Sequence, residues 1–145
     1  MYKRILIPTD GTEASQRAIL AGVDFAREVG AEVVGLTATP EFHVLSTDST
    51  MLEDTPEQFA AGSDMRARRI LADVENAARD AGVPCRTEHV VDDDPYAAVI
   101  DAARRLGCDL IVMASHGRRG LKGLLLGSET QKVLVHSAIP VLVHR

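Results

Sequence analysis

Short aliphatic runs alternate along the chain with longer segments of helical spacing. The aliphatic runs are apolar throughout instead of alternating with polar residues, and this is typical of strands that helices cover on both faces. We therefore expect a mostly parallel sheet between layers of helices. The strands are predicted at residues 4–7, 32–36, 88–91, 110–113 and 141–143.

Four helices are predicted between these strands, because apolar residues there recur at intervals of three and four. Glycines at the expected ends support three of these helices. The predicted helices end before Gly30, run over 56–81, run from Pro95 to before Gly107, and run over 128–136. The spacing places Ala18, Ala21, Phe25 and Val29 on the buried face of the first helix, Ala97, Ile100 and Ala103 on that of the third, and Thr130, Val133, Leu134 and Ser137 on that of the last.

The order of elements predicts the fold class. Right-handed crossovers between parallel strands make a doubly wound sheet the default arrangement. We expect an α/β, Rossmann-like fold, with a doubly wound, five-stranded, mostly parallel sheet and helices on both faces. At 145 residues the chain is expected to form a single domain, residues 1–145. The polar segment 40–55 breaks the regularity and is interpreted as a mobile surface loop, with a lid as the alternative.

Composition excludes several classes of protein. With 46% hydrophobic residues the chain is not disordered, and its aliphatic stretches are too short to span a membrane. A net charge of −5 and the absence of tryptophan argue against nucleic-acid binding. No apolar segment typical of a secretory signal follows Lys3 and Arg4. Cys85 and Cys108 make no disulfide framework and are interpreted as small buried hydrophobes, so we expect a cytoplasmic protein with reduced thiols.

The candidate chemistry lies after the predicted fourth strand. Ligands of open α/β sheets bind beyond the carboxyl ends of the strands. Residues 115–128 hold four glycines, one histidine and three cations, which are Arg118, Arg119 and Lys122. Glycines let backbone amides approach an anion, and Gly127-Ser128 opens a helix, where the dipole favours negative charge. The segment predicts a polyphosphate site, and the alternative is a solvated glycine-rich loop.

Several motifs occur in an order that identifies a family. Residues 3–10 look like a first strand and its turn, residues 109–117 like a fourth strand, and residues 139–143 like a final strand. Nine residues separate Gly117 from Gly127-Ser128, the spacing of a nucleotide motif, Gly-x2-Gly-x9-Gly-(Ser/Thr). On these motifs the chain resembles the universal stress protein family over its whole length.

The resemblance implies a function and an assembly. It implies a stress-response module of the ATP-binding branch, with Mg²⁺ on the phosphates, that forms a homodimer through its last strand and acts through unknown protein partners. At most slow ATP hydrolysis or self-phosphorylation on Ser128 or Thr130 is expected, and neither nucleic acid nor membrane is an expected partner. The alternative within this class is a dimeric interaction scaffold that no longer binds nucleotide.

The resemblance also implies roles for individual residues. Pro8, Thr9 and Asp10 would line the adenosine side, Ala38 would meet the adenine through its backbone, and Met113 and Ala114 would flank the ribose. The phosphates would be held by Gly117, Gly127, Ser128, Glu129 and Thr130, through backbone amides and two hydroxyls, with Arg118 and Arg119 as local cations.

Two site residues have a second interpretation. Asp10 could instead be a turn residue that helps to start the following helix. His116 could face phosphate or simply shape the loop. The other histidines, His43, His89, His136 and His144, have no partner at ligand spacing in the sequence, so no metal cluster is expected.

Three positions depart from the family pattern. Ala114 stands where the motif has its first glycine, and a modest loss of affinity is expected. Thr37 replaces a common histidine. Asp93-Asp94-Pro95 replaces Gly-x-Pro and adds negative charge that would weaken nucleotide binding if it faced the phosphates.

Two other classes of protein fit the sequence less well. An adenylating enzyme would carry Ser-Gly-Gly-x-Asp-Ser in its first turn, where this chain has Thr9-Asp10-Gly11-Thr12-Glu13, and no Walker lysine motif is present. A phosphoacceptor receiver domain would need clustered acids after the first strand and a lysine after the fifth, where this chain has His144-Arg145.

Overall fold

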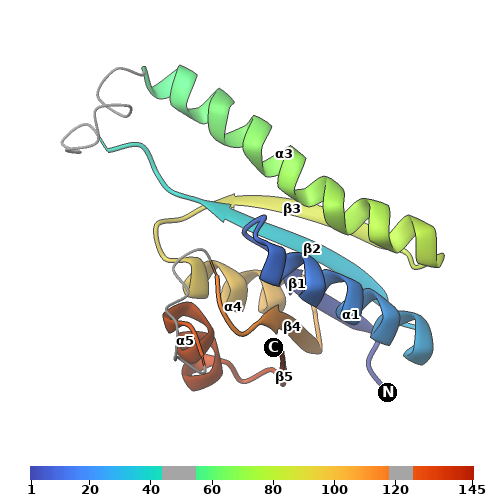
Figure 1. Cartoon of the computed structure of the whole chain (residues 1–145). Coiled ribbons are helices and arrows are strands. Elements are labelled where there is room, and N and C mark those ends of the chain that lie inside the picture. Colours follow the sequence, from blue (N-terminus) through green and yellow to red (C-terminus); the bar gives the residue numbers. More distant parts are fainter. Residues whose placement is uncertain (44–54, 118–125) are drawn as a thin grey trace.

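Parallel strands form one five-stranded sheet, in the order β3-β2-β1-β4-β5, in the part of the chain that the structure describes. The computed structural model describes residues 1–43, 55–117 and 126–145 and places helices on both faces of this sheet (Figure 1). The predicted doubly wound α/β fold is confirmed. The elements are β1 (Arg4–Pro8), α1 (Glu13–Val29), β2 (Glu32–Thr39), α3 (Pro56–Ala81), β3 (Cys85–Val91), α4 (Pro95–Arg105), β4 (Leu110–Ala114), α5 (Ser128–His136) and β5 (Val141–His144).

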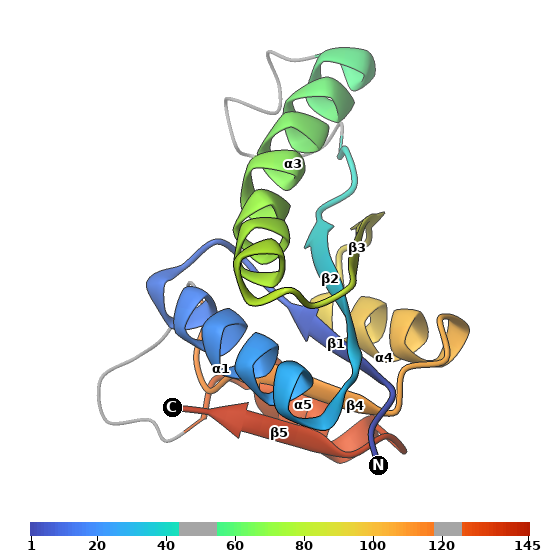
Figure 2. The ribbon, with the colours of Figure 1, turned by 90° about the vertical axis from the view of Figure 1, so that its right-hand side faces the viewer.

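Each face of the sheet carries its own hydrophobic core. Helices α1 and α3 cover one face and α4 and α5 cover the other (Figure 2). Ile5 and Ile7 of β1 pack in the core under α1 and α3, while Leu6 packs in the core on the opposite face. All three side chains are fully buried. Burial on both faces explains why the middle of β1 and all of β4 are apolar throughout instead of alternating.

The buried faces of the helices match the predicted ones only in part, since Ala18, Ala103, Thr130 and Val133 are buried as predicted. In α1 the buried residues include Ile19 and Val23, while Phe25 and Val29 are only partly buried. Gly22 explains the difference, because a Cβ at this glycine would lie 2.7 Å from Cδ1 of Ile7 on β1. Because Gly22 has no side chain, α1 packs closely on the sheet along the side of the helix that carries this residue.

The predicted faces of the last two helices also change. In α4 the face that packs on the sheet holds Ala98, Val99, Ala102 and Ala103, so Ala97 and Ile100 lie beside it. In α5 the buried residues are Thr130 and Val133, whereas Leu134 is 41% exposed. The apolar residues of α5 therefore extend beyond the contact that this helix makes with the sheet.

Strands β2 and β3 are longer than predicted. They pair in parallel register from Val33 opposite Cys85 to Thr39 opposite Val91. Because of this pairing, β2 extends three residues beyond Leu36, where the predicted strand ends. The polar residues of this extension, Thr37 and Thr39, are buried. Of the predicted loop 40–55, residues 44–54 lie outside the described residues. Within the described part of the chain, none of the helices has the length and apolar character that crossing a membrane requires.

Candidate functional site

The strand order places a topological switch point between β1 and β4, and open α/β sheets bind ligands in the crevice beyond the strand ends at such a point. These strands are neighbours in the sheet, but β1 leads to α1 on one face and β4 leads towards α5 on the other. The two connections therefore diverge at the carboxyl ends of the strands, which is where ligands bind in open α/β sheets. The predicted site residues that follow β1 and β4 lie at this point.

The carboxylate of Asp10 is held in a fixed orientation after β1. Its Oδ1 accepts hydrogen bonds from the backbone N–H of Thr12 (3.0 Å), the hydroxyl of Thr12 (2.6 Å) and the hydroxyl of Ser15 (2.8 Å). Thr12 is the N-cap of α1, so Asp10 does help to start this helix. Its second oxygen, Oδ2, is turned towards Gly117, where a Cβ would lie only 2.7 Å away. The two interpretations of Asp10 are thus compatible, because the same contacts that start α1 aim the carboxylate into the crevice.

Gly127 packs tightly against the segment that leaves β4. Its N–H donates to the carbonyl of Ser115 (2.6 Å), and a Cβ would lie 3.2 Å from that carbonyl oxygen and 3.3 Å from Cα of His116. Gly127 is also the N-cap of α5 and supplies no side-chain cap. The first amides of a helix have no acceptor within the helix, so the N-terminus of α5 carries such N–H groups next to the segment that leaves β4. Ser128, the first residue of α5, is exposed beside them.

The next two residues of α5 use their side chains to position the helix. The hydroxyl of Thr130, 3% exposed, donates to the carbonyl of Ala114 (2.9 Å) and joins α5 to β4. Oε2 of Glu129 accepts from the backbone N–H of Tyr96 in the first turn of α4 (2.9 Å), and Oε1 lies 3.5 Å from Nζ of Lys132. What these two residues offer to a ligand is therefore their backbone amides.

A polar contact that the sequence did not predict ties the turn after β1 to β2. The hydroxyl of Thr37 donates to the carbonyl of Thr9 (2.8 Å), and the N–H of Thr9 donates to the carbonyl of Leu36 (2.8 Å). Thr37 is buried, so this contact fixes the turn that carries Asp10. A threonine inside a strand covered on both faces was the available signal, because a buried hydroxyl needs a partner. Ala38, predicted to follow the strand, is a partly exposed residue of β2 itself.

The remaining predicted site residues lie in different surroundings, and two of them lie outside the described residues. Pro8 ends β1 at the rim of the crevice, and Ala114, which ends β4, is buried. The side chain of Met113 packs in the core on the face of α4 and α5. Nδ1 of His116 lies 3.0 Å from the hydroxyl of Ser115, so this ring takes part in the loop structure. The predicted cations, Arg118 and Arg119, lie outside the described residues.

Comparisons with known proteins identify the family of this chain. The sequence profile of the universal stress protein family matches residues 1–145. The chain is 30% identical over 154 residues to universal stress protein MJ0531 of Methanocaldococcus jannaschii, covering 99% of this chain and 82% of that protein. It is 31% identical over 149 residues to universal stress protein YxiE of Bacillus subtilis, with 100% of each chain covered. The solved structure of MJ0577, also from M. jannaschii, superposes with a TM-score of 0.81 at 30% identity, covering 99% of this chain and 95% of that one. This chain therefore belongs to the universal stress protein family.

Proposed function

We propose that the chain binds ATP, as its Mg²⁺ complex, in the crevice between β1 and β4. The observation that carries this proposal is the close packing at Gly117 and Gly127, which brings the turn after β1, the end of β4 and the N-terminus of α5 together without intervening side chains. Within the family, this glycine motif is typical of the members that bind ATP. Stress-response function follows from the family, and the nucleotide would act as a signal read by protein partners.

The phosphate chain is assigned to the N-terminus of α5. The amides of Ser128, Glu129 and Thr130 and the hydroxyl of Ser128 are suited to phosphate oxygens, because the helix dipole adds a partial positive charge there. Hydrogen bonds to charged groups contribute roughly 1.5–3 kcal/mol each, so three or four suffice for micromolar affinity after the entropic cost of binding. Since the carboxylate of Glu129 is turned to α4, it adds little repulsion at this point.

The adenosine side is assigned to the turn after β1 and the end of β2. Asp10, held by Thr12 and Ser15, would accept a hydrogen bond from the ribose, and the backbone of Ala38 would meet the adenine. Carboxylate and phosphate oxygens are also the ligands that Mg²⁺ prefers, and this ion keeps several waters. The donor set of the crevice therefore fits a magnesium–nucleotide complex, with Asp10 as the protein group that would orient one of its waters.

Two solved structures of universal stress proteins hold related ligands. One is in complex with cAMP, and the other, from Archaeoglobus fulgidus, is in complex with dAMP. At 23% and 18% identity they share the fold alone with this chain, so the argument for a nucleotide rests on the crevice itself.

We also infer a homodimer that forms through β5 and a cytoplasmic location. Strand β5 is at the edge of the sheet, and exposed edges of this kind are templates for pairing with a second chain. Leu142 on β5 is 38% exposed, and Val135 on the neighbouring α5 is 76% exposed. A second copy pairing along β5 would cover Leu142. The two free cysteines, Cys85 and Cys108, support a reducing compartment.

Titration calorimetry with nucleotide-stripped protein tests the nucleotide assignment. We expect micromolar binding of Mg-ATP and much weaker binding of AMP, because AMP lacks the phosphates that would reach α5. Gly127→Val should weaken ATP binding at least about tenfold, because the new side chain would fill the space next to Ser115 and His116. The backbone of Gly127 is extended (φ −72°, ψ 161°), so valine is compatible with it.

Gly62→Val is the matched control, because a Cβ at Gly62 on α3 meets only Nη1 of Arg66, at 3.6 Å. Equal ATP affinity in the Gly127 and Gly62 variants would refute the site assignment. If the unmodified protein gives neither heat nor a thermal shift with Mg-ATP, the chain is instead the interaction scaffold. The methyl group of Ala114 would then be the first feature to examine, by restoring glycine at that position.

A further inference from the structure

Three side chains with metal-binding groups converge beyond the ends of β2 and β3, outside the crevice. They are Glu41 and His43, which follow β2, and Asp93, which follows β3. One ligand atom from each residue lies within 4.8 Å of the other two. This cluster was not predictable from the sequence, since His43 and Asp93 are 50 positions apart. The pairing of β2 with β3 through Thr39 and Val91 brings them together.

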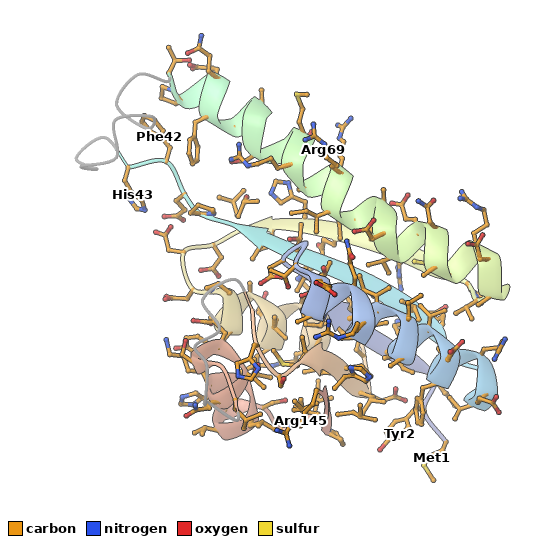
Figure 3. All side chains as sticks on the ribbon, viewed as in Figure 1. Met1, Tyr2, Phe42, His43, Arg69 and Arg145 are labelled. Carbon is orange, nitrogen blue, oxygen red and sulfur yellow. The ribbon has the colours of Figure 1, made fainter. Side chains whose placement is uncertain are left out.

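The segment that follows β2 is anchored so that two of these ligands face the same way. Phe42 packs edge to face on Phe59 of α3, with ring centroids 5.4 Å apart. Figure 3 shows Phe42 and His43 projecting to different sides of the chain. Because side chains alternate along an extended segment, the anchoring of Phe42 places its neighbours Glu41 and His43 together on the opposite side, next to Asp93.

Asp93 is oriented by the same segment. Its Oδ1 accepts from the backbone N–H of Glu41 (2.9 Å), and its Oδ2 lies 2.7 Å from Nε2 of His43. The side chains of His43 and Asp93 are 51% and 40% exposed, so an ion in solution has access to both. One carboxylate oxygen is therefore fixed by the backbone, while the other meets the imidazole nitrogen. Metal sites commonly fix a ligating carboxylate by a second-shell hydrogen bond of this kind.

We propose that Glu41, His43 and Asp93 bind a zinc ion. The ion would take the place of the proton between Nε2 of His43 and Oδ2 of Asp93, with a carboxylate oxygen of Glu41 as third ligand and water as fourth. Tetrahedral Zn²⁺ with ligand distances of about 2.1 Å holds its ligands about 3.4 Å apart. To reach this spacing, Nε2 of His43 and Oδ2 of Asp93 would move apart by less than about 1 Å, and small rotations of these exposed side chains achieve such a movement.

The ligand chemistry selects the metal. Imidazole with carboxylates suits zinc, whereas Mg²⁺ requires a near-octahedral arrangement of oxygens and retains its waters. Two carboxylates balance the charge of the ion, and Asp92 and Asp94 flank Asp93 with further negative charge. A bound ion would join the segments that follow β2 and β3, and its binding requires no nucleotide.

The test uses the full-length, tag-free protein, stripped of metal with a chelator and free of nucleotide. Zinc chloride is titrated by calorimetry, and the imidazole nitrogens are followed in long-range ¹H–¹⁵N spectra. We expect one equivalent of zinc to bind and the Nε2 resonance of His43 to shift. His43→Ala should weaken binding at least about tenfold, because loss of a ligand exceeds the loss of a second-shell partner.

Glu41→Gln is the second informative variant. It removes a carboxylate ligand but keeps the backbone N–H that orients Asp93, so weaker binding in this variant measures coordination and not loop structure. His136→Ala, which removes an exposed imidazole on α5, is the matched control and should bind zinc as the unmodified protein does. Unchanged affinity in His43→Ala, equal losses in His43→Ala and His136→Ala, or no binding by the unmodified protein would each overturn the proposal. Millimolar Mg²⁺ should not displace the zinc.

Discussion

Asp109 joins two distant parts of the chain through a single carboxylate. Its oxygens accept hydrogen bonds from the backbone N–H groups of Lys3 (2.9 Å) and Arg4 (3.1 Å), and so connect the start of β1 to the start of β4. Desolvation opposes the charged form, but these backbone donors outweigh it and hold the pKa of Asp109 below its ordinary value. Because the folded pKa is lower than the unfolded one, the charged carboxylate stabilises the fold above the unfolded pKa. This stabilisation is lost as the pH falls through the folded pKa.

Asp109→Asn should therefore lower the free energy of unfolding at pH 7, by about 1 kcal/mol or less because the group is partly exposed to solvent. The difference in the free energy of unfolding between the variant and the unmodified protein should shrink as the pH falls below about 4, because the carboxylate then becomes protonated. Urea unfolding at pH 7 and at pH 3 measures both quantities. Asp24→Asn, which removes an exposed partner of Arg27, is the control and should change little. A difference for Asp109→Asn that is the same at both pH values would contradict the explanation.

The cysteines behave as the sequence predicted, at the level of single side chains. Cys108 is 5% exposed in the core on the face of α4 and α5, and burial raises the pKa of its thiol to about 11. Burial also raises the pKa of Cys85, which is partly exposed. A thiol that stays protonated at neutral pH is a poor nucleophile, so both residues contribute packing in preference to redox chemistry.

Residues that belong to a local sequence pattern were easier to predict than residues whose contact partner is far away in the sequence. The close packing at Gly117 and Gly127 could be anticipated because a glycine spacing before a helix start is a local pattern, whereas the ligand roles of these glycines and of Ser128 stay predictions. The hydroxyl of Thr37 in β2 contacts Thr9 in the turn after β1, so the sequence could signal that this hydroxyl needs a partner, but only the pairing of β1 with β2 identifies the partner.

Glycine also controls how closely the elements pack. A Cβ at Gly35 in β2 would lie 3.0–3.1 Å from three carbons of Val74 on α3. Val74 is fully buried, and its branched side chain has few rotamers with which to move away. The distance between α3 and the sheet is therefore set by the absence of a side chain at Gly35.

Gly35→Ala should destabilise the protein by about 1–3 kcal/mol, because α3 must move away from β2 or Val74 must leave its rotamer. Gly62→Ala provides the opposite comparison, since a Cβ at this glycine on α3 would meet only Nη1 of Arg66, at an ordinary contact distance of 3.6 Å. There, the gain in helix propensity should stabilise the protein by up to about 1 kcal/mol. Chemical unfolding of both variants gives the two free energies. Stabilisation by alanine at position 35 would show that the two elements are not in tight contact.

At the scale of elements, the sequence predicted the type and order of the helices and strands better than their first and last residues. All five strands and all four helices of the described chain match predicted segments, because long periodic patterns determine the type of an element. The ends of β2 and β3 were missed because polar residues such as Thr39 are held there by pairing between the strands. The buried face of α1 was missed because Gly22 carries no hydrophobic signal, although its small size decides which side approaches the sheet.

At the scale of the whole molecule, the sheet has two edge strands, β3 and β5, and the proposed dimer uses β5. Leu142→Lys should convert a dimer into a monomer, because a buried lysine at the pairing edge would lack a partner. Light scattering coupled to size exclusion measures the mass directly. Leu20→Lys is the matched control, since Leu20 is 60% exposed on α1 and the substitution should leave the mass unchanged. A Leu142→Lys protein that remains a soluble dimer would exclude β5 as the pairing edge.

The strand order has a consequence for the moment at which the site first exists during protein synthesis. β1 can pair with β2 as soon as the first 39 residues are available, but its other neighbour, β4, begins only at Leu110. Ribosomes add about 5–20 residues per second, so β1 would wait several seconds with one side uncovered. The crevice needs α5 as well, and is thus among the last features to form. The proposed ligand could therefore bind only after the residues of α5, which end at His136, have been made.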